Sequence, residues 1–152
     1  MKELKVSILN EKKTIEFGKN ISNYLSEGFL IFLKGELGTG KTTLTRGLIR
    51  GLGHKESVKS PTYSLLEQYK FEKLNINHFD LYRFNSSNEW LTSGFHEYIN
   101  NVDVNIIEWP EIAGDILPKP DLEIEIFYEN AGRSIDIKSF TEKGNACLIN
   151  LL

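Results

Sequence analysis

Several features that define whole classes of protein are missing from this chain of 152 residues. It contains one cysteine, Cys147, so no disulfide bond can form within the chain. No apolar run approaches the roughly 20 residues that cross a bilayer, and residues 1–13 lack the apolar segment of a signal peptide. We therefore expect a cytoplasmic protein that has no contact with a membrane.

A surplus of positive charge is also missing. The 18 lysines and arginines are outnumbered by 21 aspartates and glutamates, which gives a net charge of −3. Proteins that bind nucleic acid unaided neutralise many phosphates with a broad basic surface. Any contact with nucleic acid is therefore expected to be local or shared with a partner. The length predicts a single domain, residues 1–152, with room for a sizeable core.

What the chain does contain is a series of clear apolar patterns. Period-2 alternation predicts a strand over residues 2–9, and apolar residues at helical spacing predict a helix over about residues 15–25. A continuous apolar run predicts a buried strand over about residues 29–34. From Lys41 onward leucines recur every four residues, which predicts a helix that ends near Gly53.

The second half of the chain predicts two antiparallel hairpins and one more buried strand. The first hairpin joins residues 63–71 to residues 74–82, and a short helical region follows at about residues 87–100. Residues 104–110 are typical of a buried strand that a proline ends, and residues 122–137 form the second hairpin around an Asn-Ala-Gly turn. The sequence therefore predicts an α/β fold whose mixed sheet has a parallel core, antiparallel hairpins and flanking helices.

Residues 35–42, GELGTGKT, match the pattern G-x-x-x-x-G-K-[ST] between a predicted strand and a predicted helix. Small residues let consecutive backbone N–H groups converge on phosphate oxygens, and the helix N-terminus adds partial positive charge. In this pattern Lys41 reaches the β- and γ-phosphates of a nucleoside triphosphate, and the Thr42 hydroxyl binds Mg²⁺. Thr43 is either a further hydroxyl of the site or only a residue of the first helical turn. The loop predicts a P-loop NTPase-like domain.

Hydrolysis of a bound triphosphate also requires an acidic residue near the metal. Asp80 and Glu108 each end a predicted strand, where a carboxylate can hold Mg²⁺ or orient an attacking water. The strand before Glu108 is the more continuously apolar, so the pattern favours Glu108 as the usual acid. It does not assign the two roles, and either residue could instead be an ordinary solvated carboxylate.

Four segments in this order make the chain resemble a known family. They are the glycine loop, SPTY at residues 60–63, HFDLYR at residues 78–83 and IEWPE at residues 107–111. In a chain this short they closely resemble the TsaE (YjeE) family, small bacterial P-loop ATPases needed for making threonylcarbamoyladenosine (t6A) in tRNA. The resemblance covers about residues 3–140, and the tail, residues 141–152, carries no family signal.

The resemblance implies roles for individual residues. Asp80 is expected to be the Walker-B-like acid on the metal side, and Glu108 to lie near the γ-phosphate, with Trp109 beside the nucleotide. The SPTY segment is expected to be a mobile, switch-like loop in which Thr62 approaches the metal. The expected nucleotide-binding residues are Gly35, Glu36, Leu37, Gly38, Thr39, Gly40, Lys41, Thr42, Thr43 and Trp109. The expected catalytic residues are Lys41, Asp80 and Glu108, and the expected Mg²⁺ ligands are Thr42, Asp80 and Glu108.

The HFDLYR segment holds three further candidates. A lone histidine on a half-buried strand is more often a packing residue than a catalyst, so we interpret His78 as part of the core. Tyr82 is interpreted in the same way. Arg83 could neutralise phosphate charge, dock on a partner or pair with a nearby carboxylate, and the pattern does not choose between these roles.

The resemblance also implies what the triphosphate is for. ATP with Mg²⁺ is expected to power a conformational step in a larger assembly, whose other members are TsaD- and TsaB-like proteins that carry out the threonylcarbamoyl transfer. Contact with tRNA is then indirect, through that complex. We expect slow hydrolysis by the isolated chain, because no complete water-activating set of residues is visible in the sequence.

Three other functions remain open from the sequence. A small kinase needs cationic residues over the γ-phosphate, but the chain has only four arginines and two of them lie on the predicted helix after the loop. A GTPase-like switch fits Thr62, although DLYR stands where D-x-x-G is expected and no N-K-x-D is present. A nucleotide-sensing module would bind ATP and release no phosphate even with its partners present.

Overall fold

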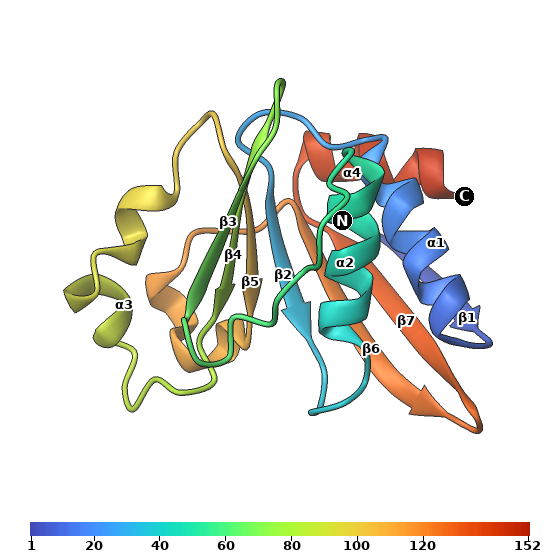
Figure 1. Ribbon diagram of the computed structural model, residues 1–152, viewed down its shortest axis with the longest axis horizontal. Helices are drawn as coiled ribbons and strands as arrows, with labels where there is room; N and C mark the ends of the chain where they lie inside the picture. The colour runs from blue at the N-terminus through green and yellow to red at the C-terminus, as the bar shows by residue number, and fades with distance from the viewer.

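A mixed β-sheet of seven strands forms the centre of the protein, and the computed structural model describes residues 1–152 (Figure 1). The strands are β1 (Lys2–Ile8), β2 (Leu30–Lys34), β3 (Leu66–Lys70), β4 (Asn75–Asp80), β5 (Val104–Glu108), β6 (Leu122–Glu129) and β7 (Gly132–Ser139). The helices are α1 (Glu11–Ser22), α2 (Lys41–Gly51), α3 (Glu89–Thr92) and α4 (Glu142–Leu151), with 3₁₀ turns η1 (Phe95–Tyr98), η2 (Pro110–Ile112) and η3 (Gly114–Ile116).

The middle of the sheet is parallel and its borders are antiparallel. The strand order is β1-β7-β6-β2-β5-β4-β3. β6, β2, β5 and β4 run parallel to one another, whereas β3 pairs antiparallel with β4, and β7 and β1 continue antiparallel beyond β6. Central parallel strands are covered on both faces, which is why β2 and β5, in the middle of the sheet, are the most continuously apolar strands of the sequence. The predicted mixed α/β fold with a parallel core and two hairpins is confirmed.

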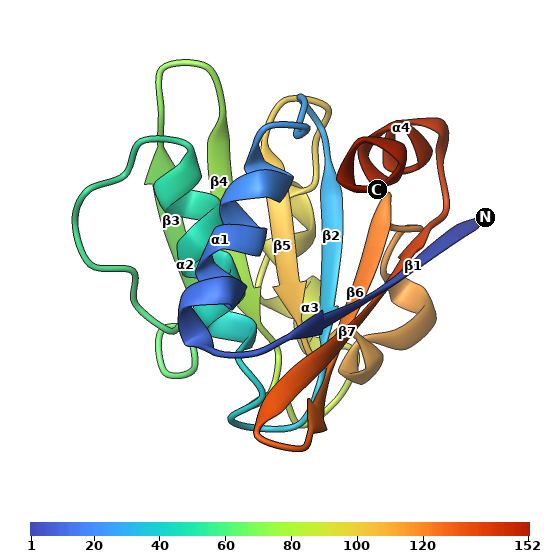
Figure 2. The same cartoon turned by 90° about the vertical axis from the view of Figure 1, so that its right-hand side faces the viewer.

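Helices and turns cover both faces of the sheet (Figure 2). On one face α1, α2 and α4 contribute Ile21, Leu44 and Leu148 to a core cluster that also holds Ile31 and Ile106 of the strands. On the other face α3 and the 3₁₀ turns cover a smaller, more aromatic cluster. Its buried members are Leu30, Phe79, Leu81, Phe84, Trp90, Ile107, Ala113 and Leu117. Successive strand residues point to opposite faces, so neighbours in β2 enter different clusters.

α1 and α2 pack against each other at very short range. A Cβ atom at Gly47 would lie 2.2 Å from the carbonyl oxygen of Ile15, and one at Gly18 would lie 2.3 Å from that of Leu44. No side chain tolerates such distances, so both positions require glycine for this approach of the two helices. The contact holds α2, and with it the loop at its N-terminus, against the rest of the molecule.

The first hairpin begins later than the sequence predicts. The prediction that its first strand starts at residue 63 is wrong, because β3 starts at Leu66. Residues 61–64 form a turn, and Leu65 has a φ of +69°, which breaks the extended backbone. Tyr63 is 83% exposed, so its place in the apolar alternation does not reflect burial.

The helical predictions hold in part. The region predicted over residues 87–100 divides into α3 and η1 at Gly94, which has a φ of +80°. The tail, which carries no family signal, forms α4, and its Cys147 and Leu148 are buried in the larger cluster. None of the helices combines the length and the apolar character that a membrane crossing requires.

Candidate functional site

The carboxyl ends of three parallel strands lie side by side at one edge of the sheet. β2 leads into the glycine loop, residues 35–40, while β5 and β4 end at Glu108 and Asp80. The register pairs Asp80 with Glu108, and Glu108 with Leu33 of β2. The two carboxylates are therefore neighbours, and both lie beside the loop. Open α/β sheets bind their ligands at this edge.

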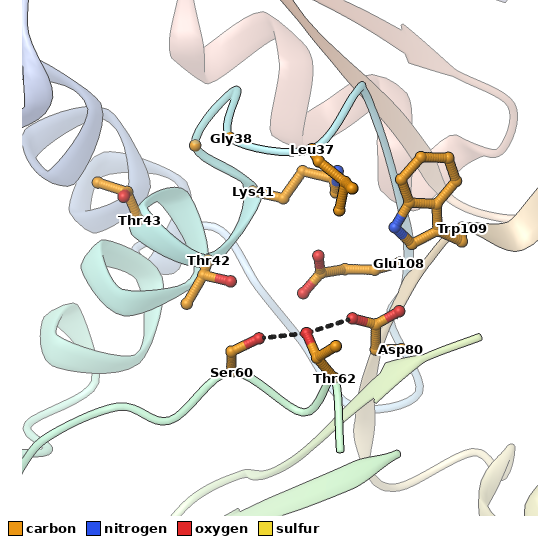
Figure 3. Close-up of a pocket in the computed structure, with 11 residues that line it drawn as sticks. Leu37, Gly38, Lys41, Thr42, Thr43, Ser60, Thr62, Asp80, Glu108 and Trp109 are labelled. Carbon is orange, nitrogen blue, oxygen red and sulfur yellow. Dashed lines mark hydrogen bonds between the residues drawn. The ribbon is translucent and has the colours of Figure 1, made fainter. Parts of the chain in front are cut away.

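A cavity of about 310 Å³ opens between these segments (Figure 3). Its lining residues are Leu37, Gly38, Gly40, Lys41, Thr42, Thr43, Ser60, Thr62, Asp80, Glu108 and Trp109. Among the predicted site residues, Gly35, Glu36 and Thr39 are absent from the lining and instead make hydrogen bonds within the loop. All the other predicted residues line the cavity, and Ser60 and Thr62 of the SPTY segment close its lower side in Figure 3.

The glycine loop leaves the start of α2 open. Gly38 and Gly40 have φ values of +80° and +114°, in the left-handed region that favours glycine. Gly40 is the N-cap of α2, and no side chain caps the first N–H groups of the helix. Uncapped N–H groups and the positive end of the helix dipole attract an anion. The loop therefore has the local structure of a phosphate-binding turn.

Lys41 carries its charge inside this loop. The residue is 6% exposed, and Nζ donates to the carbonyl oxygens of Gly35 and, at 3.1 Å, Glu36. Nζ also lies 4.5 Å from the centroid of the Trp109 ring. Burial lowers the pKa of Lys41, and nearby carboxylates, Glu108 first among them, oppose that shift. Lys41 forms no ion pair, so its charge is free to meet an anion in the cavity.

Asp80 is held by two hydrogen bonds. It accepts one from the backbone N–H of Tyr82 at 2.9 Å and one from the Thr62 hydroxyl at 3.1 Å, and the Thr62 and Ser60 hydroxyls lie 2.8 Å apart (Figure 3). Burial raises the pKa of Asp80 above its ordinary value; the Tyr82 hydrogen bond opposes this shift and the Glu108 carboxylate adds to it. The SPTY segment is thus tied to Asp80 across the cavity.

Glu108 has one side-chain partner, His78. The His78 Nε2 and Glu108 Oε2 atoms lie 2.6 Å apart, and both residues are buried. The interpretation of His78 as a core residue is correct for its burial but misses this contact. His78 and Asp80 are two residues apart on β4, so their side chains lie on the same face of the sheet. That spacing is the signal in the sequence that places His78 at the site.

A family model described as "Threonylcarbamoyl adenosine biosynthesis protein TsaE" matches residues 8–135. The chain belongs to the TsaE family. The matched range contains the glycine loop, both strand-end carboxylates and the SPTY, HFDLYR and IEWPE segments. The family resemblance that these segments predict is therefore confirmed.

Known TsaE proteins match nearly the whole chain. The tRNA threonylcarbamoyladenosine biosynthesis protein TsaE of Haemophilus influenzae is 38% identical over 149 residues, which cover 95% of this chain and 94% of that protein. The protein of the same name from Bacillus subtilis is 34% identical over 145 residues, covering 95% and 89%. The crystal structure of Bacillus subtilis YdiB has a TM-score of 0.84 at 27% identity and covers 99% of this chain and 94% of its own.

One aromatic residue, Trp109, lines the first cavity of this TsaE family member, and Tyr82 packs against it. Trp109 has a φ of +57°, and its ring lies 5.0 Å from that of Tyr82. The interpretation of Tyr82 as a core residue is wrong, because it follows the end of β4 and is 43% exposed. The Arg83 guanidinium lies 4.2 Å from the centroid of the Tyr63 ring and forms no ion pair, so pairing with a carboxylate is excluded among its three open roles.

Two residues that the sequence reasoning missed hold the TsaE glycine loop by hydrogen bonds to its carbonyl oxygens. Arg133 Nε donates to the Thr39 carbonyl at 2.8 Å and Nη2 to the Gly38 carbonyl at 3.4 Å. The Tyr128 hydroxyl donates to the Leu37 carbonyl at 2.8 Å. Both come from the β6–β7 hairpin, about ninety positions away in the chain. No local pattern relates the hairpin to the loop, because β6 reaches β2 only through the sheet.

A second cavity, of about 390 Å³, lies on the other side of the TsaE loop. Its lining residues are Leu9, Asn10, Glu11, Thr14, Gly38, Thr39, Gly40, Thr43, Ala131, Gly132 and Arg133. Gly38, Gly40 and Thr43 line both cavities. Thr43 lies in the first turn of α2 and lines both cavities. A role for its hydroxyl in the site stays a prediction.

The donors around the first cavity suit a hard cation. Thr42, Thr62, Asp80 and Glu108 offer hydroxyl and carboxylate oxygens, which Mg²⁺ prefers. No group of three or more His, Cys, Asp or Glu side chains is arranged to hold a metal by itself. Mg²⁺ is commonly bound by one or two carboxylates together with substrate phosphates and water, and the donor set fits that mode.

Proposed function

We propose that this protein is a P-loop ATPase of one domain, residues 1–152, that hydrolyses Mg²⁺–ATP in the biosynthesis of threonylcarbamoyladenosine in tRNA. One observation carries the proposal. The lysine of a G-x-x-x-x-G-K-[ST] loop lines the same cavity as two carboxylates, Asp80 and Glu108, that the register places side by side. A triphosphate-binding loop and an acidic pair at its far side are the parts that nucleotide hydrolysis needs.

The triphosphate occupies the first cavity and the nucleoside the second. The uncapped start of α2 and Lys41 bind the β- and γ-phosphates, so Lys41 exchanges the loop carbonyls for phosphate oxygens. The Thr42 hydroxyl and the Asp80 carboxylate hold Mg²⁺, with Glu108 close by. When bound, the ion neutralises phosphate charge and orients the γ-phosphate for attack. Two cavities that share the loop support this division.

Glu108 is the residue that orients the attacking water. The water oxygen forms a bond to the γ-phosphorus while the bond from phosphorus to the bridging oxygen breaks, which releases ADP and phosphate. The proton that the water loses passes to Glu108, whose carboxylate points into the cavity (Figure 3). Because Asp80 already accepts two hydrogen bonds, it is the less available of the two as a base.

The free energy of hydrolysis drives a partner assembly. The names of the relatives place them in threonylcarbamoyladenosine biosynthesis, and the partners we propose are TsaD- and TsaB-like proteins that act on tRNA in the cytoplasm. The net charge of −3 supports tRNA contact through that complex. Leu37 lines the first cavity and is 59% exposed, and Tyr82, which packs against Trp109 of the lining, is 43% exposed. These exposed apolar side chains support a protein partner at this edge.

Phosphate release from ATP tests the proposal. The purified protein is assayed alone and then with its TsaD and TsaB counterparts and tRNA. We expect slow release alone and strong stimulation by the partners. Binding of ATP without any release in the complete mixture would contradict the ATPase and favour a sensing module. Tight binding of GTP alone, or transfer of the phosphoryl group to a small acceptor, would favour the GTPase-like or kinase alternative.

The Glu108→Ala variant tests the catalytic assignment. It is expected to bind ATP with nearly unchanged affinity and to release phosphate roughly a hundred-fold more slowly, because base catalysis contributes on this order. Glu97→Ala, which removes an exposed carboxylate on the other face of the sheet, is the matched control and should leave both quantities unchanged. An equal loss of binding and turnover in Glu108→Ala would assign Glu108 to the structure or to the metal instead.

A further inference from the structure

The contact between His78 and Glu108 is a buried hydrogen bond between two adjacent parallel strands. His78 lies on β4 and Glu108 on the adjacent parallel strand β5, and the register pairs His78 with Ile106, two residues before Glu108. The two side chains therefore share one face of the sheet. They are 0% and 2% exposed, so water does not compete for the 2.6 Å contact between Nε2 and Oε2.

The second ring nitrogen of His78 shows which atom carries the proton. Nδ1 is buried and has no hydrogen-bond partner. A buried N–H without an acceptor is costly, and a bare acceptor nitrogen is the less costly choice. A neutral ring protonated at Nε2 leaves no N–H without an acceptor, because Nε2–H donates to the Glu108 carboxylate and Nδ1 carries no proton.

Glu108 depends on this donor for its orientation. No other side chain or backbone group donates to its carboxylate, whereas Asp80 receives two hydrogen bonds. The last torsion of a glutamate is broad, so a carboxylate without a partner samples many orientations. A hydrogen bond at Oε2 restricts that torsion and leaves Oε1 free to accept a proton from a water in the cavity.

We infer that His78 is a positioning residue for Glu108: its Nε2–H holds one carboxylate oxygen and thereby directs the other at the attacking water. The inference rests on the proposed function, in which Glu108 is the base. His78 does not line the cavity, and its one side-chain hydrogen bond is to Glu108, so its effect on turnover passes through Glu108.

Two amide substitutions distinguish the loss of the Nε2–H donor from the loss of the packed imidazole ring. The side-chain nitrogen of His78→Gln reaches as far as Nε2 and can still donate to Glu108, whereas that of His78→Asn reaches only as far as Nδ1. We expect kcat for phosphate release, with the partners present, to fall roughly ten- to a hundred-fold in His78→Asn and by less than about three-fold in His78→Gln. The affinity for ATP should stay within about two-fold of wild type in both variants, because neither substitution alters the loop.

His54 provides the matched control for removing a packed histidine. It is partly buried, packs edge-on against Tyr69 and Phe71, and has a buried Nε2 without a partner, but it lies outside both cavities. His54→Asn should lower thermal stability and leave kcat unchanged. A fall in kcat in His54→Asn that matches the fall in His78→Asn would overturn the inference, because general loss of packing would then explain both.

A spectroscopic measurement on the wild-type ring tests the inference without turnover. In nitrogen-15 spectra of the wild-type ring we expect His78 to be protonated at Nε2, with a slowly exchanging proton that shifts in Glu108→Gln. A ring protonated at Nδ1 alone would overturn the inference.

The failure of the inference and that of the proposed function give different results. If Glu108→Ala slows phosphate release and His78→Asn does not, only the role of His78 is overturned. If Glu108→Ala leaves release unchanged, Glu108 is not the base, and both statements are overturned together.

Discussion

Lys41 is the only lysine of the chain that is buried, and its surroundings explain why it is available to a ligand. Burial lowers its pKa, and no carboxylate lies close enough to form an ion pair with it. Two loop carbonyls and the face of Trp109 hold the ammonium group. Phosphate oxygens satisfy a cation better than these neutral partners, which supports the proposal that Lys41 binds the phosphates of a triphosphate.

Lys41→Ala should weaken ATP binding by on the order of 2 kcal/mol, roughly 30-fold, because charge-assisted hydrogen bonds to the phosphates are lost. Titration calorimetry measures the change. Lys19→Ala removes an exposed lysine from the last turn of α1 and is the control, with an affinity expected within about two-fold of wild type. Unchanged binding in Lys41→Ala would reject the assignment of the loop.

The raised pKa of Asp80 predicts that the stability of the fold depends on pH. Burial raises the pKa of its carboxyl in the folded protein, so the folded state binds this proton more tightly than the unfolded state does. Above the raised pKa the ionised group therefore destabilises the fold, and the penalty is relieved as the pH falls through that value toward the ordinary one near 4.

Asp80→Asn should accordingly be more stable than wild type at pH 7, with a difference that narrows as the pH is lowered toward about 4.5. Its amide oxygen can still accept from the Tyr82 N–H, and its amide nitrogen can donate to the Thr62 hydroxyl, so both positions keep a hydrogen bond. Urea unfolding at both pH values measures the difference, with the exposed Asp115→Asn as the control. A variant less stable than wild type at pH 7 would contradict the sign of the argument.

Among the elements, the β6–β7 hairpin has the least expected role. Its turn carries Tyr128 and Arg133 on either side, and their side chains reach the carbonyl oxygens of Leu37, Gly38 and Thr39. The Arg133 guanidinium also lies 4.6 Å from the centroid of the Tyr128 ring, which holds the two side chains together. The hairpin thus orients the glycine loop through the carbonyl oxygens of three of its residues.

Arg133→Ala should loosen this loop in the protein without nucleotide. Losing the Arg133 hydrogen bonds is expected to lower the free energy of unfolding by about 1 kcal/mol and to speed amide hydrogen exchange at residues 36–40. Arg83→Ala removes an exposed arginine that touches Tyr63 and not the loop, so exchange there should not change. Equal exchange in Arg133→Ala and wild type would show that the loop holds its conformation unaided.

At the scale of the whole molecule, the last helix and the site lie at opposite ends of the sheet. The glycine loop, Asp80 and Glu108 lie at the carboxyl ends of the parallel strands, whereas α4 lies at the other end (Figures 1 and 2). There Asp121 accepts hydrogen bonds from the backbone N–H of Leu30, at 2.8 Å, and from the Thr141 hydroxyl. Thr141 in turn is the N-cap of α4, so one buried carboxylate joins β2 to the last helix.

Leu148→Ala should lower the free energy of unfolding by about 2–4 kcal/mol, because this side chain of α4 is 1% exposed in the larger core cluster. Its neighbour Ile149 is 51% exposed, so Ile149→Ala is the control and should change the value by less than about 0.5 kcal/mol. Urea unfolding distinguishes them. The folded Leu148→Ala protein should bind ATP as wild type does, and a loss of affinity would show that α4 supports the site.

Local patterns in the sequence predict the glycine loop, its flanking strand and helix, both hairpins and the two strand-end carboxylates, and the structure contains all of them. The predictions are wrong where the apolar pattern of a segment does not match the burial of its residues in the structure. Tyr63 is in phase with the apolar residues of β3 but lies in the turn before that strand. Tyr82 lies beyond the end of β4 at Asp80. The tail carries no family signal, yet it forms a helix that buries Cys147 and Leu148 in the larger core cluster.

By itself the sequence determined the parts of this TsaE family member, because strand and helix periodicity and the conformations that glycine allows act over a few residues. Only the tertiary structure decided which parts meet. The order of parallel strands depends on long crossovers that leave no local trace, and that order pairs Asp80 with Glu108 and brings Arg133 to the loop. The contact of His78 with Glu108 has the same origin, since it forms only once β4 lies beside β5.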